Sequence, residues 1–146
     1  LWYNKYGRLL TKDSYKDGKK EGESLEYHDN GRLWFKRNFK DDKLDGEYLS
    51  YHENGQLKQK SYYKDGKEEG EYLRYWDNGQ LKMKGNFKDD VREGKWILNY
   101  YSGVLENKRN YKKGIQEGEQ FLYDEYGQLL KTEIYKDGEL IKTIKP

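Results

Sequence analysis

The stretch that decides the fold is residues 47–70, EYLSYHENGQLKQKSYYKDGKEEG. Two short runs rich in Tyr and Leu, 47–52 and 57–63, are separated by Asn54-Gly55, and the second run ends at Asp65-Gly66. Asn-Gly and Asp-Gly between such runs are strong signals for tight hairpin turns, whose left-handed backbone angles suit these residues best. Runs of about six residues also have the usual length of strands. We therefore expect this stretch to form a β-hairpin.

The hairpin pattern recurs every 24 residues along the chain. The period is visible in one series of glycines, Gly22, Gly46, Gly70, Gly94 and Gly118, and in the leucines Leu9, Leu33, Leu57, Leu81, Leu105 and Leu129. A fixed period this short indicates one small unit that is copied and stacked. One turn departs from the pattern, since Tyr101-Ser102-Gly103 replaces the Asp-Asn-Gly or Glu-Asn-Gly of other units, and we expect a looser turn there.

These repeats predict an all-β fold, an elongated single-layer antiparallel sheet that forms a meander of about six 24-residue β-hairpin repeats. We expect a single domain over residues 1–146. Its repeats are expected at about 1–22, 23–46, 47–70, 71–94, 95–118 and 119–142, with a C-terminal cap strand at about 139–145.

The composition predicts an ordered but shallow structure. Apolar residues make up only 33% of the chain and charged residues 38%, yet 16 Tyr, 4 Trp and 4 Phe are more aromatic residues than disordered chains contain. The net charge of +2, from 29 basic and 27 acidic residues, argues against a general attraction to nucleic acid or membranes. Cysteine is absent, which excludes disulfides, thiolate metal sites and cysteine nucleophiles.

Alternation along the strands assigns side chains to the two faces of the sheet. The positions that hardly vary between units, typified by Leu25, Leu33 and Phe39, are interpreted as ladders that form one apolar face. The opposite parity varies from unit to unit, and we expect function there. On this interpretation the varied face carries an aromatic stripe beside a lysine stripe.

The aromatic stripe is the first candidate for a partner-binding site. Its candidate residues are Tyr48, Tyr72, Trp76, Trp96, Tyr100 and the neighbouring His52. Contiguous exposed apolar surface tends to mark an interface, and Tyr and Trp are favoured interface anchors. The alternative interpretation is that a thin sheet exposes aromatic rings in any case.

The lysine stripe supports a different function, the binding of a polyanion or a lipid headgroup. It consists of Lys36, Lys60, Lys84 and Lys108. Lysines beside aromatic rings also suit single-stranded nucleic acid, but the near balance of acidic and basic residues makes the counterion-release contribution small. Lysines on exposed sheet positions also keep sheets soluble and prevent edge pairing.

Nothing in the sequence indicates catalysis, a metal or a cofactor. The two histidines, His28 and His52, occupy equivalent positions about 10 Å apart, which is too far for one metal whose ligands lie about 2.1 Å from it. The repeating glutamates, such as Glu47 and Glu71, form a solvated ladder rather than a carboxylate pair in a cleft. No Gly-rich phosphate loop occurs, because the glycines serve periodic turns. We therefore expect a protein that is not an enzyme.

The unit EGEYLxYxxNGQLKxKxxYKDGKxEG resembles the MORN repeat, and more closely its bacterial variant, known as a YwqK-like antitoxin family. The resemblance rests on stretches such as Tyr51 to Gly55 and Tyr75 to Gly79 and on turns such as Tyr63 to Gly66, and it covers nearly the whole chain. It implies an elongated single-layer sheet of stacked hairpins. It also implies a protein-interaction scaffold, sometimes linked with membrane lipids, and for the bacterial variant an antitoxin.

Together these observations predict a non-catalytic protein–protein interaction scaffold, with an antitoxin or immunity-type protein that masks a partner as the most specific version. The expected partner is another protein, such as a cognate toxin, while membrane association is expected to be weak and nucleic acid is disfavoured. An open sheet is also compatible with homo-oligomers. The sequence does not decide the compartment, and we slightly favour the cytoplasm. Export stays open because the chain begins at Leu1 in mid-repeat and looks trimmed.

Overall fold

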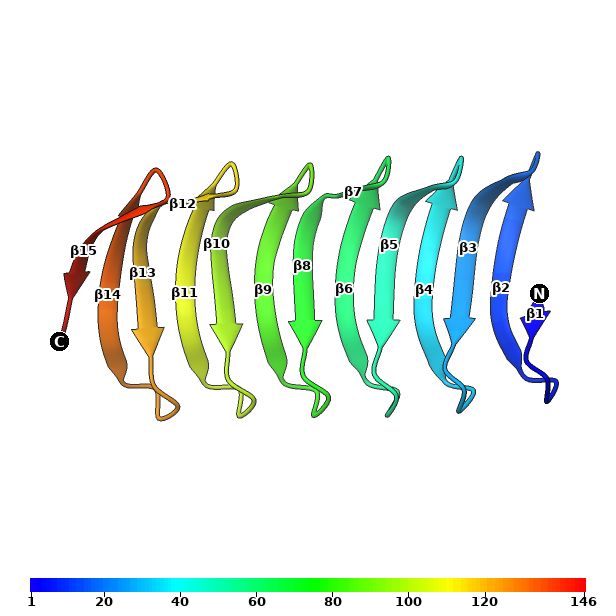
Figure 1. The fold of residues 1–146 in the computed structure, drawn as a ribbon, viewed down its shortest axis with the longest axis horizontal. Coiled ribbons are helices and arrows are strands. Elements are labelled where there is room, and N and C mark those ends of the chain that lie inside the picture. Colours follow the sequence, from blue (N-terminus) through cyan, green and yellow to red (C-terminus); the bar gives the residue numbers. More distant parts are fainter.

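Antiparallel strands follow one another along the whole chain in the computed structural model, which describes residues 1–146. They form one 15-stranded sheet in which each long strand pairs with the next long strand along the chain, so the N- and C-termini lie at opposite ends (Figure 1). The two-residue strands β7 and β12 pair only with β6 and β11. The secondary structure includes no helix that could span a membrane. The predicted fold class, an all-β open meander in a single layer, is confirmed.

The strands are β1 (Trp2–Tyr3), β2 (Leu9–Lys16), β3 (Lys19–Tyr27), β4 (Leu33–Lys40), β5 (Lys43–Tyr51), β6 (Leu57–Lys64), β7 (Lys67–Glu68), β8 (Gly70–Tyr75), β9 (Leu81–Lys88), β10 (Val91–Asn99), β11 (Leu105–Lys112), β12 (Ile115–Gln116), β13 (Gly118–Tyr123), β14 (Leu129–Lys136) and β15 (Glu139–Ile144).

Two kinds of turn join the strands, one along each long edge of the sheet (Figure 1). At the upper edge, two-residue turns such as Asp65-Gly66 have both residues left-handed, with φ of 51° and 87°. At the lower edge only the glycine is left-handed, as Gly55 is with φ of 89°, and its N–H donates to the His52 carbonyl over 2.8 Å. The prediction that Asn54 is left-handed is therefore wrong, since these are longer loops that end in a glycine bulge.

The expectation of a looser turn at 101–103 is also wrong. The Gly103 N–H donates to the Tyr100 carbonyl over 2.9 Å, and the Tyr100 N–H donates to the Val104 carbonyl over 2.8 Å, which are the bonds of the other lower-edge turns. The glycine at the end of the loop is sufficient to close it, whichever residues precede it.

A bulge near the upper edge bends each unit. Tyr63 pairs with Glu68 and Lys60 pairs with Leu73. The same length of sheet therefore takes three residues on β6 and five residues across β7 and β8. The extra residues include Gly70, whose φ of 83° is left-handed. Such bulges bend and twist a strand. In Figure 1, strands such as β3, β5 and β10 accordingly bend close to the upper edge.

The register corrects the predicted assignment of the two faces. Tyr48 lies opposite Arg37 and Ser61, whereas Leu49 lies opposite Lys36 and Lys60. Residues directly opposite in an antiparallel pair share a face. We call the face that carries Tyr48 the inner face and the face that carries Leu49 and Lys60 the outer face.

Two predictions fail for this reason. Phe39 pairs with Gly22 and shares the inner face, while Leu25 pairs with Lys36 on the outer face, so Leu25 and Phe39 do not form one apolar ladder. The aromatic and lysine stripes likewise lie on opposite faces instead of side by side. The prediction used the alternation of side chains within each strand. Which residues of two strands lie opposite each other also depends on the extra residues in loops and bulges, and these were not counted.

The core is as shallow as the composition predicts. Only 10 of the 146 residues are buried, and only two of these, Trp96 and Tyr111, are large hydrophobic residues. Both lie on the inner face, where Trp96 pairs with Arg109 and Tyr111 with Gly94. The inner face therefore holds the core, and the predicted aromatic site residues lie on the same face.

Candidate functional site

The inner face divides into two halves along the strands. The half toward the upper edge holds an aromatic cluster, which we define as Tyr48, Tyr63, Tyr72, Phe87, Trp96 and Tyr111. The half toward the lower edge holds an open groove beside the turns, and we call it the turn-proximal groove. The sequence-predicted site residues are split between these two halves.

The rings of the aromatic cluster pack against one another across the strands. Ring centroids are 5.5 Å apart for Tyr48 and Tyr63, 5.4 Å for Tyr72 and Phe87, and 5.0 Å for Phe87 and Trp96. Separations of 4.5–7 Å in tilted or edge-on geometry are those at which aromatic pairs stabilise a core. Burial accordingly raises the pKa of both Tyr48 and Tyr72.

Trp96 is at the centre of this cluster and is only 4% exposed, so the prediction that it belongs to an exposed stripe is wrong. Its ring lies over Gly85, where a Cβ would come within 2.1 Å of the indole. The Arg92 guanidinium lies 4.7 Å from the Trp96 ring centroid and covers it further. Tyr48 and Tyr72, both half-buried, lie in the same packed half as Trp96.

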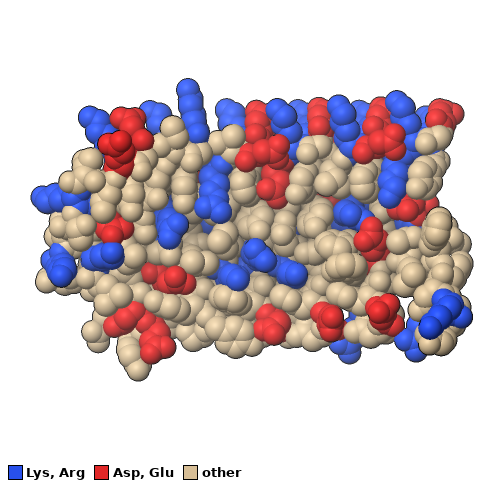
Figure 2. Space-filling view, in the orientation of Figure 1, with Lys and Arg blue, Asp and Glu red and all other residues tan.

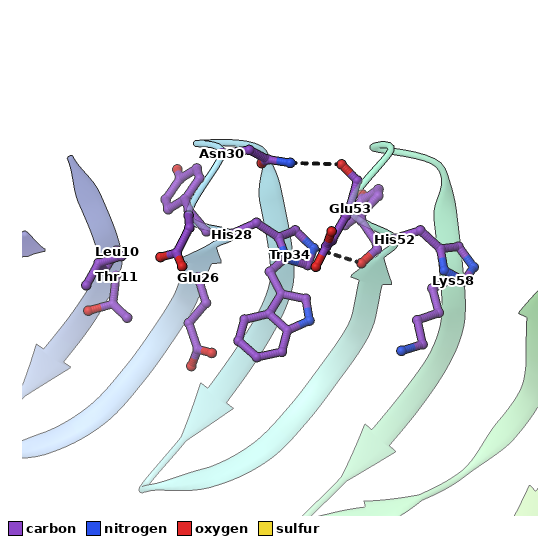
Figure 3. Close-up of a pocket in the computed structure, with 12 residues that line it drawn as sticks. Leu10, Thr11, Glu26, His28, Asn30, Trp34, His52, Glu53 and Lys58 are labelled. Carbon is purple, nitrogen blue, oxygen red and sulfur yellow. Dashed lines mark hydrogen bonds between the residues drawn. The ribbon is translucent and has the colours of Figure 1, made fainter. Parts of the chain in front are cut away.

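The turn-proximal groove consists of two adjoining hollows. The larger, about 770 Å³, lies over β2 to β6 and includes Glu26, Trp34 and Lys58 (Figure 3). The smaller, about 370 Å³, shares His52 and Lys58 with the first and continues to Trp76. In Figure 3, Glu26 and Trp34 lie within the curve of the strands.

A row of side chains at the lower edge connects each hairpin to the next. The ring nitrogen Nε2 of His52 lies 3.1 Å from the Tyr75 carbonyl, and His28 makes the same contact with Tyr51. Farther along, the Trp76 indole N–H donates to the Tyr100 carbonyl over 3.1 Å. His, Trp and Tyr at this position thus do one structural job.

Tyr100 occupies the next position in this row, and its hydroxyl donates to the Tyr123 carbonyl over 2.9 Å. The predicted site residues His52 and Trp76 are therefore anchored where they line the groove, and Tyr100 is anchored in the same row just beyond it. Sequence reasoning missed this connecting role, although the 24-residue spacing of polar-tipped rings was a signal for it.

The Asn of each lower-edge turn makes a second connection. Asn54 Oδ1 accepts from the Gln56 N–H over 3.0 Å, and Asn54 Nδ2 donates to the Asp77 carbonyl of the next turn over 2.6 Å. Asn78 makes the last of these bonds, to the Tyr101 carbonyl, because Ser102 has no such bond to the following turn. These bonds hold the lower lip of the groove together.

One variable position of the groove was not selected from the sequence. Equivalent residues in successive hairpins are Trp34, Lys58, Lys82 and Glu106. Trp34 stacks on His28 with ring centroids 5.2 Å apart, and Lys82 Nζ lies 3.8 Å from the Trp76 ring centroid. Trp34 and Lys82 therefore each rest on the connecting residue of their own hairpin.

Electrostatics distinguish Lys82 from the other lysines. Its pKa lies below the ordinary value because burial removes water from the ammonium group and Arg74 and Lys58 repel it, with Glu106 opposing the shift. Neither Lys58, Arg74 nor Lys82 forms an ion pair within 4 Å. The middle of the groove is thus a concentration of unpaired positive charge.

The lysine stripe of the outer face has a different environment. Lys36, Lys60 and Lys84 pair with Glu23, Glu47 and Glu71 at 3.0, 3.1 and 2.7 Å, and these hydrogen bonds raise the pKa of each lysine. Lys108 has no ion pair, because Lys95 stands where the other units have Glu. Three of the four lysines are therefore neutralised by their own repeat.

Charge also lines the two edges of the sheet. Acidic and basic side chains alternate along the upper edge (Figure 2), where Lys19 pairs with Asp41 at 2.9 Å and Lys67 with Asp89 at 3.3 Å. Acidic side chains dominate the lower edge in the same view. No three His, Asp or Glu side chains are arranged to hold a metal ion.

Comparison with known protein families gives one result. The family model described as "MORN repeat variant" matches five consecutive segments, residues 20–41, 44–65, 68–89, 92–113 and 116–137, which together cover most of the chain. No curated protein matches the chain. Each matched segment encloses one lower-edge turn and ends at the first residue of an upper-edge turn, so the family pattern follows the hairpins seen in the structure.

Proposed function

We propose that this chain, which belongs to the MORN repeat variant family, is a non-catalytic scaffold that binds another protein in its turn-proximal groove. MORN repeats are associated with protein or membrane-lipid binding and are generally non-catalytic modules. Of these two associations we select protein binding, and we assign it to the turn-proximal groove of the inner face.

The observation that carries the proposal is the variation of the groove floor. One equivalent position holds Trp34, Lys58, Lys82 and Glu106 in successive hairpins, while the outer face repeats nearly the same Leu, Lys and Glu. A surface that discriminates between proteins needs unlike groups at defined places, and a uniform ladder cannot supply them. Trp34, with 41% of its surface exposed, offers the kind of aromatic anchor that interfaces use.

This assignment revises the partner-binding set proposed from the sequence. His52 and Trp76 line the groove and keep a proposed role in binding, while Tyr100 continues the row of connecting residues beyond it. Tyr48, Tyr72 and Trp96 serve the packing of the aromatic cluster. Binding of a polyanion or lipid headgroup by the lysine stripe is disfavoured, because Glu47 and its equivalents neutralise three of its four lysines.

The more specific form of the proposal is an antitoxin or immunity-type protein that masks a cognate toxin. An open groove along a long sheet suits this role, since it covers an extended segment of a partner without needing a closed pocket. A direct test is to express the neighbouring gene product with and without this chain and to follow cell growth. Growth arrest that this chain relieves supports the antitoxin form, and an innocuous neighbour contradicts it.

The general proposal is tested with a purified partner. The immobilised chain captures proteins from a cell extract in low and in high salt, and the captured protein is then produced and titrated against the chain. Recognition through packed side chains survives high salt better than attraction between exposed charges does. We expect Trp34→Ala to weaken the purified complex by about tenfold or more, as removal of an interface anchor does.

Lys60→Ala on the outer face is the matched control, and we expect it to leave affinity unchanged. A partner that binds Trp34→Ala and the unmodified chain equally, or that is lost with Lys60→Ala, would contradict the assignment to the groove. Thermal melting of each variant shows whether a loss of binding follows from a loss of folding.

A further inference from the structure

The unpaired cations of the groove lie on three consecutive strands. Lys58 is on β6, Arg74 on β8 and Lys82 on β9, and these strands are neighbours in the sheet. Arg74 pairs with Gln59 on one side and with Met83 on the other, which places it between the two lysines. With strands about 4.8 Å apart, the two lysines stand about 10 Å from each other along the groove.

These three side chains are half-buried in the smaller hollow, which Trp76 and His52 also line. Two other cations of this face have carboxylate partners, since Lys20 pairs with Asp13 at 3.1 Å and Arg37 pairs with Glu26. Arg92 instead covers the Trp96 ring and donates to the Tyr111 hydroxyl over 3.3 Å. The acid that borders the hollow is Asp77, and it forms no ion pair with the three cations. It accepts a hydrogen bond from the Tyr101 hydroxyl instead, which raises the pKa of Tyr101. Glu106 is near enough to act on the charge of Lys82, but no carboxylate lies within 4 Å of any of the three cations.

We propose that the Lys58–Arg74–Lys82 cluster binds an acidic segment of the partner protein, whose carboxylates lie across β6, β8 and β9. This inference rests on the proposed function and adds the chemistry of the partner. Guanidinium and ammonium groups that are already partly dehydrated bind carboxylates more strongly than fully exposed ones do. Trp76 beneath Lys82 holds the ammonium group in place by a cation–π contact.

The shape of the site favours a protein segment over a membrane surface. The cations lie in a hollow beside the lower-edge turns, and these turns expose Asp29, Glu53 and Asp77 at equivalent positions. A flat anionic bilayer would meet this acidic rim before it reached the cations, whereas a single extended chain can enter beside the rim. Figure 2 shows the acidic side chains gathered along that edge.

The spacing predicts a register for the segment. In a polyproline II conformation every third residue lies on one side of the chain, and three residues span about 9.3 Å, which matches the separation of equivalent positions in adjacent hairpins. A segment with carboxylates at every third residue therefore places successive acids near Lys58 and Lys82. Arg74, between them, is left to bond the backbone or an intervening carboxylate.

The test uses the full chain and a fluorescent peptide with Glu at every third residue between Pro and Ala, together with the same peptide carrying Gln in place of Glu. We expect saturable binding of the Glu peptide only, weakened about tenfold or more in the variant K58Q/R74Q/K82Q. The matched control is K36Q/K60Q/K84Q, which removes the same charge from the outer face and is expected to bind like the unmodified chain.

Equal losses in both triple variants would overturn the inference, because they would show attraction to the whole molecule's charge. Stronger binding to phosphatidylserine vesicles than to the Glu peptide would overturn it in favour of a lipid. A partner protein that binds K58Q/R74Q/K82Q normally but loses affinity with Trp34→Ala would remove this inference and leave the proposed function intact. Recovery of binding between K58E/R74E/K82E and a peptide with Lys at every third residue would place the contact at this cluster.

Discussion

The aromatic cluster and the turn-proximal groove occupy the same face of the same repeats, yet their side chains meet different surroundings. In the cluster, rings from neighbouring strands close over small residues such as Ser61 and Gly85, and Trp96 is buried. In the groove, side chains such as Trp34 and Lys82 stand on residues that are bonded to the next hairpin, and Trp34 stays 41% exposed. One repeat thus supplies a single-layer sheet with a core in one half and leaves the other half open.

The difference between the two halves indicates at which positions of a single-layer sheet the side chains can change between repeats. A side chain in the cluster changes together with its neighbours, as Trp96 and Gly85 do, because the rings touch. A side chain at the groove floor rests mainly on its own hairpin, so Trp34, Lys58 and Lys82 can differ without repacking the sheet. The following changes test this division of the inner face, beginning with the largest expected effect.

Trp96→Ala should have the largest effect on folding. The change removes a ring that is 4% exposed and contacts Tyr72, Phe87 and Tyr111, so we expect the free energy of unfolding to fall by about 3–5 kcal/mol. Trp76→Ala, which removes a partly exposed ring from the groove, should cost about 1–2 kcal/mol. Urea denaturation followed by circular dichroism measures both. Equal costs would contradict the division of the inner face.

Gly85→Ala tests why the cluster can close. A Cβ at this position would come within 2.1 Å of the Trp96 indole, so the ring must move, and we expect a loss of about 2 kcal/mol. The cause is lack of space rather than backbone angle, because the φ of Gly85 is not in the left-handed region. In the Trp96→Ala background the same substitution should cost almost nothing, and an additive double variant would rule out the steric explanation.

Much of this architecture could be predicted from the sequence because its determinants are local. Each turn is set by a few adjacent residues, so the periods of Gly55 and Gly66 predict the hairpins and their order. The faces could not be predicted this way. The loop before Leu57 and the bulge at Gly70 each add residues that change how two strands match, and counting alternation within one strand does not register them.

The candidate site was only partly predictable for a related reason. Exposure of Trp96 depends on Gly85, a residue of the neighbouring strand, and sequence reasoning treated each strand alone. A signal was present, since Gly85 is the one glycine that belongs to none of the 24-residue series. The groove position of Trp34, Lys58, Lys82 and Glu106 was overlooked because it holds aromatic, basic and acidic side chains instead of repeating one type. That mixture is the property that makes it useful for recognition.

Asn54→Ala should affect the groove half without disturbing the cluster. The change removes the bond to the Gln56 N–H and the bond to the Asp77 carbonyl, and we expect a loss of about 1 kcal/mol. Amide hydrogen exchange should speed up in the two connected turns and stay unchanged around Trp96. Ser102→Ala is the control, expected to change stability by less than about 0.5 kcal/mol because Ser102 has no bond to the following turn. Faster exchange around Trp96 would show that the two halves are coupled.

Glu68→Gln should give the smallest effect, and it tests the electrostatics of the cluster half. Burial raises the pKa of Glu68, whose Oε1 accepts a hydrogen bond from the Tyr63 hydroxyl over 3.1 Å. A carboxyl group with a raised pKa contributes stability that is complete below its unfolded-state pKa and is lost as the pH rises through its folded-state pKa. Above its folded-state pKa the carboxyl group no longer makes that contribution, whereas the amide of the Glu68→Gln variant stays neutral and keeps a side-chain oxygen for Tyr63.

We therefore expect the melting temperature of Glu68→Gln to exceed that of the unmodified chain at pH 7, by on the order of 1 °C because the half-buried group is partly screened by water. The difference should shrink as the pH falls toward about 4, where the unfolded carboxyl takes up its proton. Glu53→Gln, at an exposed turn of the groove half, should show neither the rise nor its pH dependence. A fall in melting temperature for Glu68→Gln at pH 7 would mean that the charge itself supports the cluster, which would make that half more like the groove than its packing indicates.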